Sequence, residues 1–208
     1  MKRKTKKFWS LRYPIGVLIF LTVFIQACVI MIDENNFRGL TSTEAKYIKP
    51  LEDYSNKTLV ENKKDLFLYE VSASELKLMI KNNKYSWIHL WRPYCTSQKC
   101  QNINYYTNIA DKYKDLNFIL VSESYDFQTI KKILIANNYT YYIYVLKDSI
   151  YGHKIIPAKK LFTDEITAGS NIKSNFLNDD FIFKDSNLIF ATKELTEKIC
   201  DSLLFNLK

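Results

Sequence analysis

The spacing of apolar and polar residues predicts short strands that alternate with helices. Six mostly apolar runs read as strands, at residues 66–71, 86–91, 117–122, 141–145, 181–183 and 188–190. Apolar residues at helical spacing predict helices at residues 72–82, 95–113, 126–137, 158–166 and 193–207. This order predicts an α/β fold with a mixed central sheet, because helices that alternate with strands cover both faces of a sheet.

Local signals support several of these elements. Ser72 and Glu75 form a capping-box pattern that starts the helix at 72–82, and Thr41 with Glu44 forms a second one that predicts a short helix. The polar residues 184–187 separate the last two strands and predict a hairpin. The stretch from 148 to 178 is less regular and reads as an insertion that contains one helix.

A long apolar segment near the N-terminus predicts attachment to a membrane. Residues 14–32 carry no charge, and nineteen residues at 1.5 Å each nearly span a hydrocarbon core. Basic residues precede this segment, and Asp33 and Glu34 follow it, which favours a cytoplasmic N-terminus. The rest of the chain is therefore expected outside the cytoplasm, in a bacterial cell envelope.

The way this segment ends leaves two alternatives open. Residues 25–28 resemble a bacterial lipoprotein box, in which Cys28 would carry the lipid, although Gln26 departs from it and the apolar residues 29–32 are unusual after a lipidated cysteine. The other alternative is an uncleaved single-span anchor, in which Cys28 is a small apolar residue of a helix. The expected organisation is a leader at 1–32, a polar tether at 33–64 and a folded domain at 65–208.

The charge of the chain does not indicate a nucleic-acid partner. The formal net charge is +8, but six of these charges belong to the acid-free residues 1–12, which leaves the rest of the chain nearly balanced. A nucleic-acid surface requires basic residues clustered in the folded part. The sequence also shows no phosphate loop, paired catalytic carboxylates or serine-nucleophile motif, so we expect no cofactor.

Two cysteines mark the candidate site. Cys95 and Cys100 follow a buried strand at the predicted start of a helix, where N–H groups and the helix dipole favour a thiolate. The segment Trp91-Arg92-Pro93-Tyr94-Cys95 resembles the Trp-x-Pro-Trp-Cys lead of the thioredoxin family, and the order of elements over residues 66–207 is similar to that fold. The resemblance implies an envelope-facing thiol–disulfide oxidoreductase with Cys95 as the attacking thiol.

The same resemblance implies further roles around Cys95. Trp91, Pro93 and Tyr94 become candidate partner-binding residues, with the alternative that the aromatic rings belong to the core and its rim. His89 occupies the place of a buried acid that handles the proton of the second cysteine, and histidine suits this because it titrates near pH 6.5. The alternative is a packed strand residue with one hydrogen bond.

Three features depart from the family pattern. The second cysteine is five residues after the first instead of three, and in a regular helix this spacing turns the two side chains about 140° apart. A disulfide between them therefore requires a loop. The family's proline before the final hairpin is missing, because residues 177–180 read Leu-Asn-Asp-Asp and Pro157 comes too early. The insertion at 148–178 is the third departure.

Several functional hypotheses remain open. The first is a tethered oxidoreductase in which Cys95 attacks a protein disulfide and Cys100 resolves the mixed disulfide. The second is a redox-inactive module that binds a partner in envelope assembly or export, and the third is a monothiol enzyme that uses Cys95 alone. A zinc site made from Cys95, Cys100, His89 and His153 is disfavoured, because the histidines are unpaired and distant. Cys200 is expected to be buried and inert.

Overall fold

The computed structural model describes residues 35, 40–51, 66–95, 100–113 and 115–205. The strands are β1 (Ile48–Pro50), β2 (Leu68–Val71), β3 (Tyr85–Trp91), β4 (Leu116–Ser122), β5 (Ile143–Leu146), β6 (Asp180–Lys184) and β7 (Asn187–Thr192). The helices are η1 (Ala45–Tyr47), a 3-10 turn, and α2 (Ala73–Met79), α3 (Ile103–Lys112), α4 (Phe127–Ala136), α5 (Asp148–Tyr151), α6 (Ile155–Thr167) and α7 (Glu197–Phe205). In the described ranges no helix is both long and apolar enough to cross a bilayer, and the predicted segment 14–32 lies outside them.

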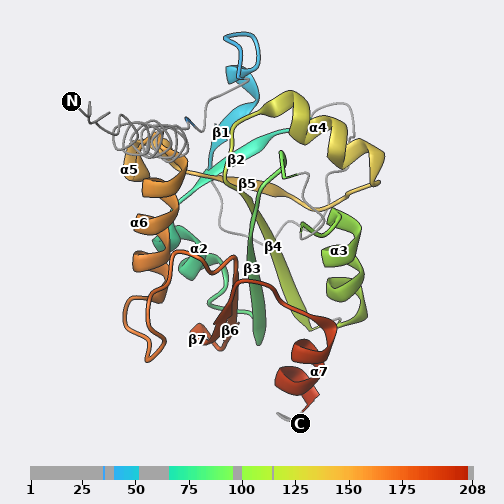
Figure 1. Ribbon diagram of the computed structural model, residues 1–208, viewed down its shortest axis with the longest axis vertical. Helices are drawn as coiled ribbons and strands as arrows, with labels where there is room; N and C mark the ends of the chain where they lie inside the picture. Colours follow the sequence, from blue (N-terminus) through green and yellow to red (C-terminus); the bar gives the residue numbers. More distant parts are fainter. Residues whose placement is uncertain (1–34, 36–39, 52–65, 96–99, 114, 206–208) are drawn as a thin grey trace, which may run out of the picture. The chain divides into compact units, whose positions relative to one another are not determined.

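The strands form one mixed sheet in the order β1-β2-β5-β4-β3-β6-β7 (Figure 1). The neighbours from β1 to β3 are parallel, whereas β6 is antiparallel to both β3 and β7. The hairpin turn between β6 and β7 places Asp185 and Ser186 at positive φ. The structure therefore confirms the predicted mixed sheet and its closing hairpin.

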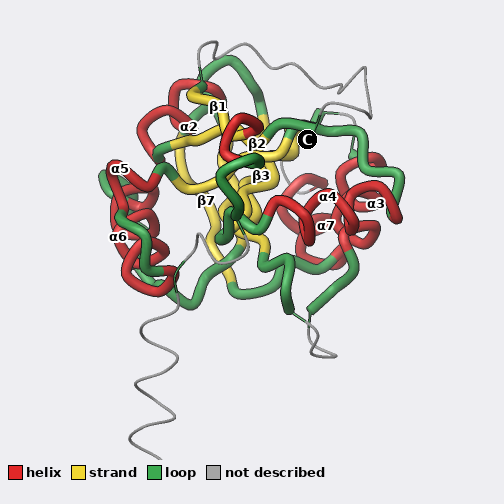
Figure 2. Tube along the Cα trace, turned by 90° about the horizontal axis from the view of Figure 1, so that it is seen from above, coloured by secondary structure: helices red, strands yellow, loops and turns green. Residues whose placement is uncertain are grey.

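Helices cover both faces of the sheet, as predicted. Figure 2 shows α5 and α6 on one side, and α3, α4 and α7 on the other. Alternation along the central strand β3 explains the two cores: Trp87 and Trp91 pack with α3 and α4, whereas Ile88 and Leu90 pack with α2 and α6. All seven residues of β3 are buried, as expected for a strand that is covered on both faces.

Three elements differ from the sequence prediction. Helix α3 begins at Ile103 and not near Cys95, with Asn102 as its N-cap. The stretch from 148 to 178 holds two helices, and Pro157 is accommodated because it lies in the first turn of α6, where its missing N–H costs nothing. Strand β1, inside the range expected to be a polar tether, pairs with β2 at the edge of the sheet.

Candidate redox site

A disulfide joins Cys95 and Cys100 directly after the central strand. The strand β3 ends at Trp91, the chain turns at Pro93 and Tyr94, and the Cys95 N–H donates a hydrogen bond of 3.1 Å to the Arg92 carbonyl. The Cα atoms of the two cysteines are 6.0 Å apart, within the range that a disulfide requires. Neither cysteine belongs to a helix, so the expectation that helical geometry separates them does not apply.

The later start of α3 changes the environment of the two sulfur atoms. Cys95 is eight positions before the first residue of the helix, whereas Cys100 is three positions before it. Cys100 is exposed and Cys95 is partly buried. The helix N-terminus stabilises a thiolate only within about one turn. This effect therefore applies more to Cys100 than to Cys95, whereas the sequence placed both cysteines at the start of the helix.

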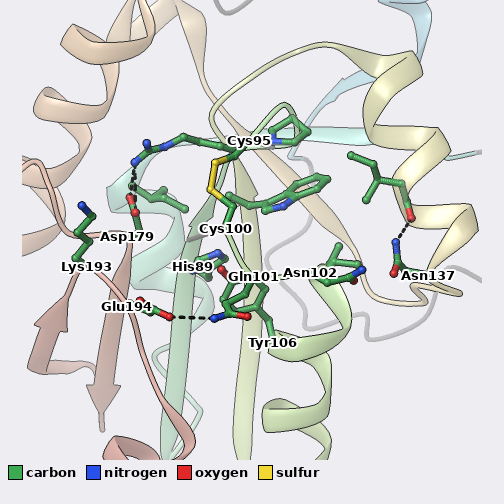
Figure 3. Close-up of a pocket in the computed structure, with 16 residues that line it drawn as sticks. His89, Cys95, Cys100, Gln101, Asn102, Tyr106, Asn137, Asp179, Lys193 and Glu194 are labelled. Atoms are coloured by element: carbon green, nitrogen blue, oxygen red, sulfur yellow. Dashed lines mark hydrogen bonds and ion pairs between the residues drawn. A yellow bond between two sulfur atoms is a disulfide. The ribbon is translucent and has the colours of Figure 1, made fainter. Parts of the chain in front are cut away.

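The disulfide opens on a cavity of about 630 Å³. Figure 3 shows this cavity between the end of β3, the N-terminal end of α3 and the segment that precedes α7. His89 and Tyr106 line it together with the disulfide, and Asp179, Lys193 and Glu194 contribute charged side chains. The site can therefore admit a side chain or a small thiol next to the sulfur atoms.

The candidate binding residues have unequal exposure. Trp91 and Pro93 are buried, and the Trp91 ring belongs to the core that contains α3 and α4. Tyr94 is exposed. Of the two aromatic candidates, Trp91 thus belongs to the core and Tyr94 to the surface. Tyr94 is the residue of the three that a partner could contact.

His89 is buried and has a specific partner. Its Nδ1 atom lies 2.7 Å from Oδ1 of Asp180, a carboxylate on the neighbouring antiparallel strand β6. The same oxygen accepts a hydrogen bond of 2.7 Å from Trp87 Nε1, and Oδ2 accepts one of 2.8 Å from the Leu195 N–H. Asp180 was not predicted from the sequence, although an acid at the first position of an apolar strand was a visible signal.

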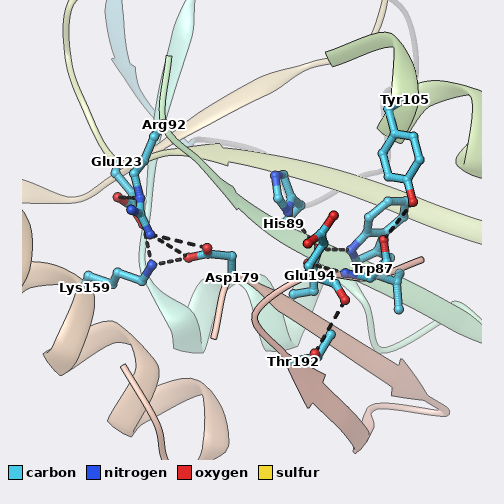
Figure 4. Close-up of polar contacts among 11 residues, drawn as sticks. Trp87, His89, Arg92, Tyr105, Glu123, Lys159, Asp179, Thr192 and Glu194 are labelled. Carbon is cyan, nitrogen blue, oxygen red and sulfur yellow. Dashed lines mark hydrogen bonds and ion pairs between the residues drawn. The ribbon is translucent and has the colours of Figure 1, made fainter. Parts of the chain in front are cut away.

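A second polar cluster lies on the other side of the same strand ends (Figure 4). Arg92 Nε is 2.9 Å from Glu123, and an Arg92 Nη atom is 3.2 Å from Asp179. Lys159 lies 2.8 Å from Glu123 and also contacts Asp179. Glu123 and Lys159 are almost completely buried, whereas Arg92 is half-exposed, so two cations and two carboxylates neutralise one another in a cluster that extends from the interior to the surface.

The charge cluster was missed for a physical reason. Lys159 occupies the apolar face of α6, between Ile155 and Phe162, where a charged residue is the exception. Burial raises the pKa of Asp179, and its neighbour Glu123 adds to this, although Lys159 and Arg92 oppose it. Because Arg92 also accepts the Cys95 N–H through its carbonyl, the cluster fixes the segment that carries the disulfide.

The remaining candidates lie apart from the site. His153 is exposed, and in the part of the chain that the structure describes no three His, Cys, Asp or Glu residues are placed to hold a metal ion. Cys200 is buried in α7, and burial raises the pKa of its thiol to about 12. This agrees with the expectation of an inert thiol, because the thiolate is the reactive form. Cys28 lies outside the described residues.

Comparisons with known proteins find a few similar solved structures. No family model matches the sequence, and no curated protein matches it. The thioredoxin domain of a thiol-disulfide oxidoreductase from Bacteroides vulgatus is 13% identical, with a TM-score of 0.42 over 62% of this chain and 82% of that one. A thioredoxin-like protein in its oxidised form is 18% identical, with a TM-score of 0.39 over 75% and 91%. Oxidised thioredoxin from Plasmodium falciparum is 11% identical, with a TM-score of 0.31 over 66% and 96%.

Proposed function

We propose that this protein is a membrane-tethered, extracytoplasmic thiol–disulfide oxidoreductase of the thioredoxin-like type. The observation that carries the proposal is the Cys95–Cys100 disulfide, which lies at the end of the central strand and opens on a cavity. A disulfide that lines a cavity can be reached by a thiol of another molecule, which is the requirement for exchange. The mixed sheet and the Trp91–Cys95 segment add support, because both match the resemblance found in the sequence.

The reaction that we propose is disulfide exchange with a protein partner. In the reduced form, the Cys95 thiolate attacks a partner disulfide, one partner sulfur leaves as a thiolate, and a mixed disulfide forms. Cys100 then loses its proton and attacks the Cys95 sulfur, which restores the Cys95–Cys100 disulfide and releases the second partner sulfur. The partner leaves as a dithiol after its two thiolates take up the Cys100 proton and one proton from water. The two electrons pass from this protein to the partner, and the reverse sequence reduces this protein.

The location belongs to the same proposal. The basic residues 1–12 and the apolar segment 14–32 favour a chain that is attached to the membrane by this segment or by a lipid on Cys28. The folded part then faces the oxidising side of the membrane, where disulfides persist. The partner is a protein that carries a thiol or disulfide in the same compartment.

The first test is a redox titration of the full-length protein in detergent. We expect a glutathione series, read by peptide mass spectrometry after alkylation, to show reversible two-electron oxidation of Cys95 and Cys100 with a single potential. Cys200 should stay reduced throughout because it is buried. If the two cysteines do not exchange with glutathione at any ratio, the enzyme proposal fails and a redox-inactive binding module is the better description.

Single-cysteine variants test the order of attack. With Cys95 as the attacking thiol, Cys100→Ser should accumulate a stable mixed disulfide with a model protein disulfide, because nothing resolves it. Cys95→Ser should accumulate much less, and Cys200→Ala is the matched control that should behave like the unmodified protein. Preferential trapping by Cys95→Ser instead would assign the attack to Cys100.

A further inference from the structure

The folded domain begins at Asn35, and the contact of this residue places the entry of the chain beside two helices. Asn35 forms an isolated antiparallel bridge with Lys154, the N-cap of α6. Asn35 is also the first residue of the compact unit that contains the sheet and the disulfide. The chain therefore enters the domain at the junction between α5 and α6, two helices that Figure 1 shows in orange.

This entry point leaves a very short connection to the apolar segment. Only Asp33 and Glu34 separate the uncharged segment 14–32 from Asn35. Three residue steps span at most about 11 Å, even when the chain is fully extended. If a lipid on Cys28 is the anchor instead, seven steps span at most about 25 Å. With either attachment, the connection holds the α5–α6 junction close to the membrane surface.

The same junction exposes large apolar side chains. Ile150 of α5 is 51% exposed and Ile156 of α6 is 39% exposed, and they lie on either side of Lys154 in the chain. Leu161, farther along α6, is 51% exposed. Exposed apolar side chains of this kind mark contacts with a protein or a membrane, and the short connection favours the membrane. Lys160 is exposed one turn after Ile156, and a lysine can keep its ammonium group among lipid headgroups while its stem packs on apolar surface.

The disulfide lies at the same edge of the sheet as this junction. Strands β3 and β5 both run parallel to β4, which separates them. The disulfide follows the end of β3 and α5 follows the end of β5, so both leave the sheet at the carboxyl ends of its parallel strands. The two strand ends are two strand spacings apart, or about 10 Å. A domain that rests on the membrane by the α5–α6 junction therefore keeps the disulfide at its membrane-facing end.

We propose that the α5–α6 junction docks on the phospholipid surface of the membrane, with Ile150 and Ile156 in the interface and Lys160 among the headgroups. The contact is stabilised because the two isoleucine side chains leave water for the boundary between headgroups and acyl chains. The docked domain presents its disulfide to partners whose sulfur atoms lie near the bilayer surface. The inference rests on the membrane attachment in the proposed function and does not depend on the exchange reaction.

The test measures how close the junction lies to lipid in the full-length protein. The protein is reconstituted in vesicles of phosphatidylcholine and phosphatidylglycerol in which some headgroups carry a nitroxide quencher. A fluorescent label is attached to Ile150→Cys or to Ile135→Cys, and the signal of the unmodified oxidised protein is subtracted. Ile135 is the matched control because it is 53% exposed near the end of α4, which covers the opposite face of the sheet (Figure 2). We expect the nitroxide to quench the label at position 150 about threefold or more strongly than the label at position 135.

A charge at the junction tests whether apolar contact holds it on the lipid. Ile156→Asp places a carboxylate in the proposed interface, where burial of a charge is costly. We expect this variant to lower the quenching of the label at position 150 to the level found at position 135. Ile135→Asp is the control for the substitution and should leave the label at position 150 unchanged. Because both isoleucines are exposed, both variants should fold, and circular dichroism checks this.

Equal quenching at positions 150 and 135 would overturn the inference and describe a domain that moves freely on its connection. An unchanged signal in Ile156→Asp would also overturn it, because the short connection alone would then hold the junction near the bilayer. If the unmodified protein does not float with the vesicles in a density gradient, the membrane attachment in the proposed function itself fails. Flotation and quenching therefore distinguish the two failures.

Discussion

At the scale of single residues, Lys159 is the buried cation that neutralises the charge cluster. It contacts both Glu123 and Asp179, and the other cation that the described residues place against both carboxylates is the half-exposed Arg92. We expect Lys159→Met to lower the free energy of unfolding by about 3–5 kcal/mol, because it leaves two carboxylates, one of them fully buried, to share a single half-exposed cation. Urea denaturation of the oxidised protein at pH 7 measures this difference.

The pH dependence of the same variant gives an internal check. The Asp179 pKa is already raised by burial, and removal of Lys159 takes away the attraction that opposes this rise. Protonation of the carboxylates removes the unpaired charge, so the deficit of Lys159→Met should shrink as the pH falls below about 5. The exposed Lys112, which pairs with Glu197 at the surface, provides the control, and Lys112→Met should change stability little. A loss of equal size for both lysines would contradict the prediction.

Residue-level prediction from sequence succeeded for groups that lie close together in the chain. Cys95, Cys100 and His89 fall within a dozen residues of one another, and all three line the same cavity. Asp180 and Asp179 are about 90 residues away from His89 and Arg92, and no periodicity encodes a contact of that kind. Their position follows from the register of the antiparallel pairing between β6 and β3. The sequence predicted that the sheet is mixed, but it did not predict which residues of the two strands lie opposite each other.

At the scale of elements, helix α2 depends on its predicted capping box. The Ser72 side chain accepts from the Glu75 N–H, and the Glu75 carboxylate accepts from the Ser72 N–H at 2.7 Å and from Lys147 at 2.6 Å. Burial opposes ionisation of Glu75, but these donors outweigh it and lower its pKa below 4.5. We expect Ser72→Ala to cost about 1 kcal/mol in unfolding free energy.

The lowered pKa also fixes the direction of the pH effect. A carboxylate whose pKa is depressed in the folded state contributes stability above its ordinary value and loses it as the pH falls through the lower one. The unmodified protein should therefore lose stability relative to Glu75→Gln as the pH is lowered from about 4.5. Thermal unfolding of both proteins between pH 3 and 7 measures the difference, and parallel curves would contradict the role of Glu75.

Elements with strong local signals were predictable, and those governed by other contacts were not. The apolar run of β3, the capping box of α2 and the helical spacing of apolar residues in α4 led to correct elements. The start of α3 was placed too early: the residues between Cys95 and Ile103 are polar apart from Cys100 and give no apolar helical spacing, and the helix starts after its Asn102 cap. Strand β1 has three residues, and only its pairing with β2 defines it.

At the scale of the whole molecule, the disulfide follows the end of a central strand in a sheet that packs against two separate cores. Each core packs helices on one face of the sheet, and neither cysteine of the disulfide belongs to them. The disulfide closes a loop with a sequence separation of only 5. Because so short a loop removes little entropy from the unfolded chain, the disulfide adds at most about 2 kcal/mol to the free energy of unfolding. The folded state should therefore survive reduction.

This independence can be measured by hydrogen exchange on the oxidised and the reduced full-length protein. We expect the amides of β3, β4 and β5 to keep their protection in both states, because their hydrogen bonds and packing do not involve the disulfide. Faster exchange after reduction should be confined to residues next to Cys95 and Cys100, and a Cys95→Ala/Cys100→Ala variant should match the reduced protein. Loss of protection across the whole sheet would show that the fold requires the disulfide. A protein that opens this disulfide in every turnover could not tolerate such a requirement.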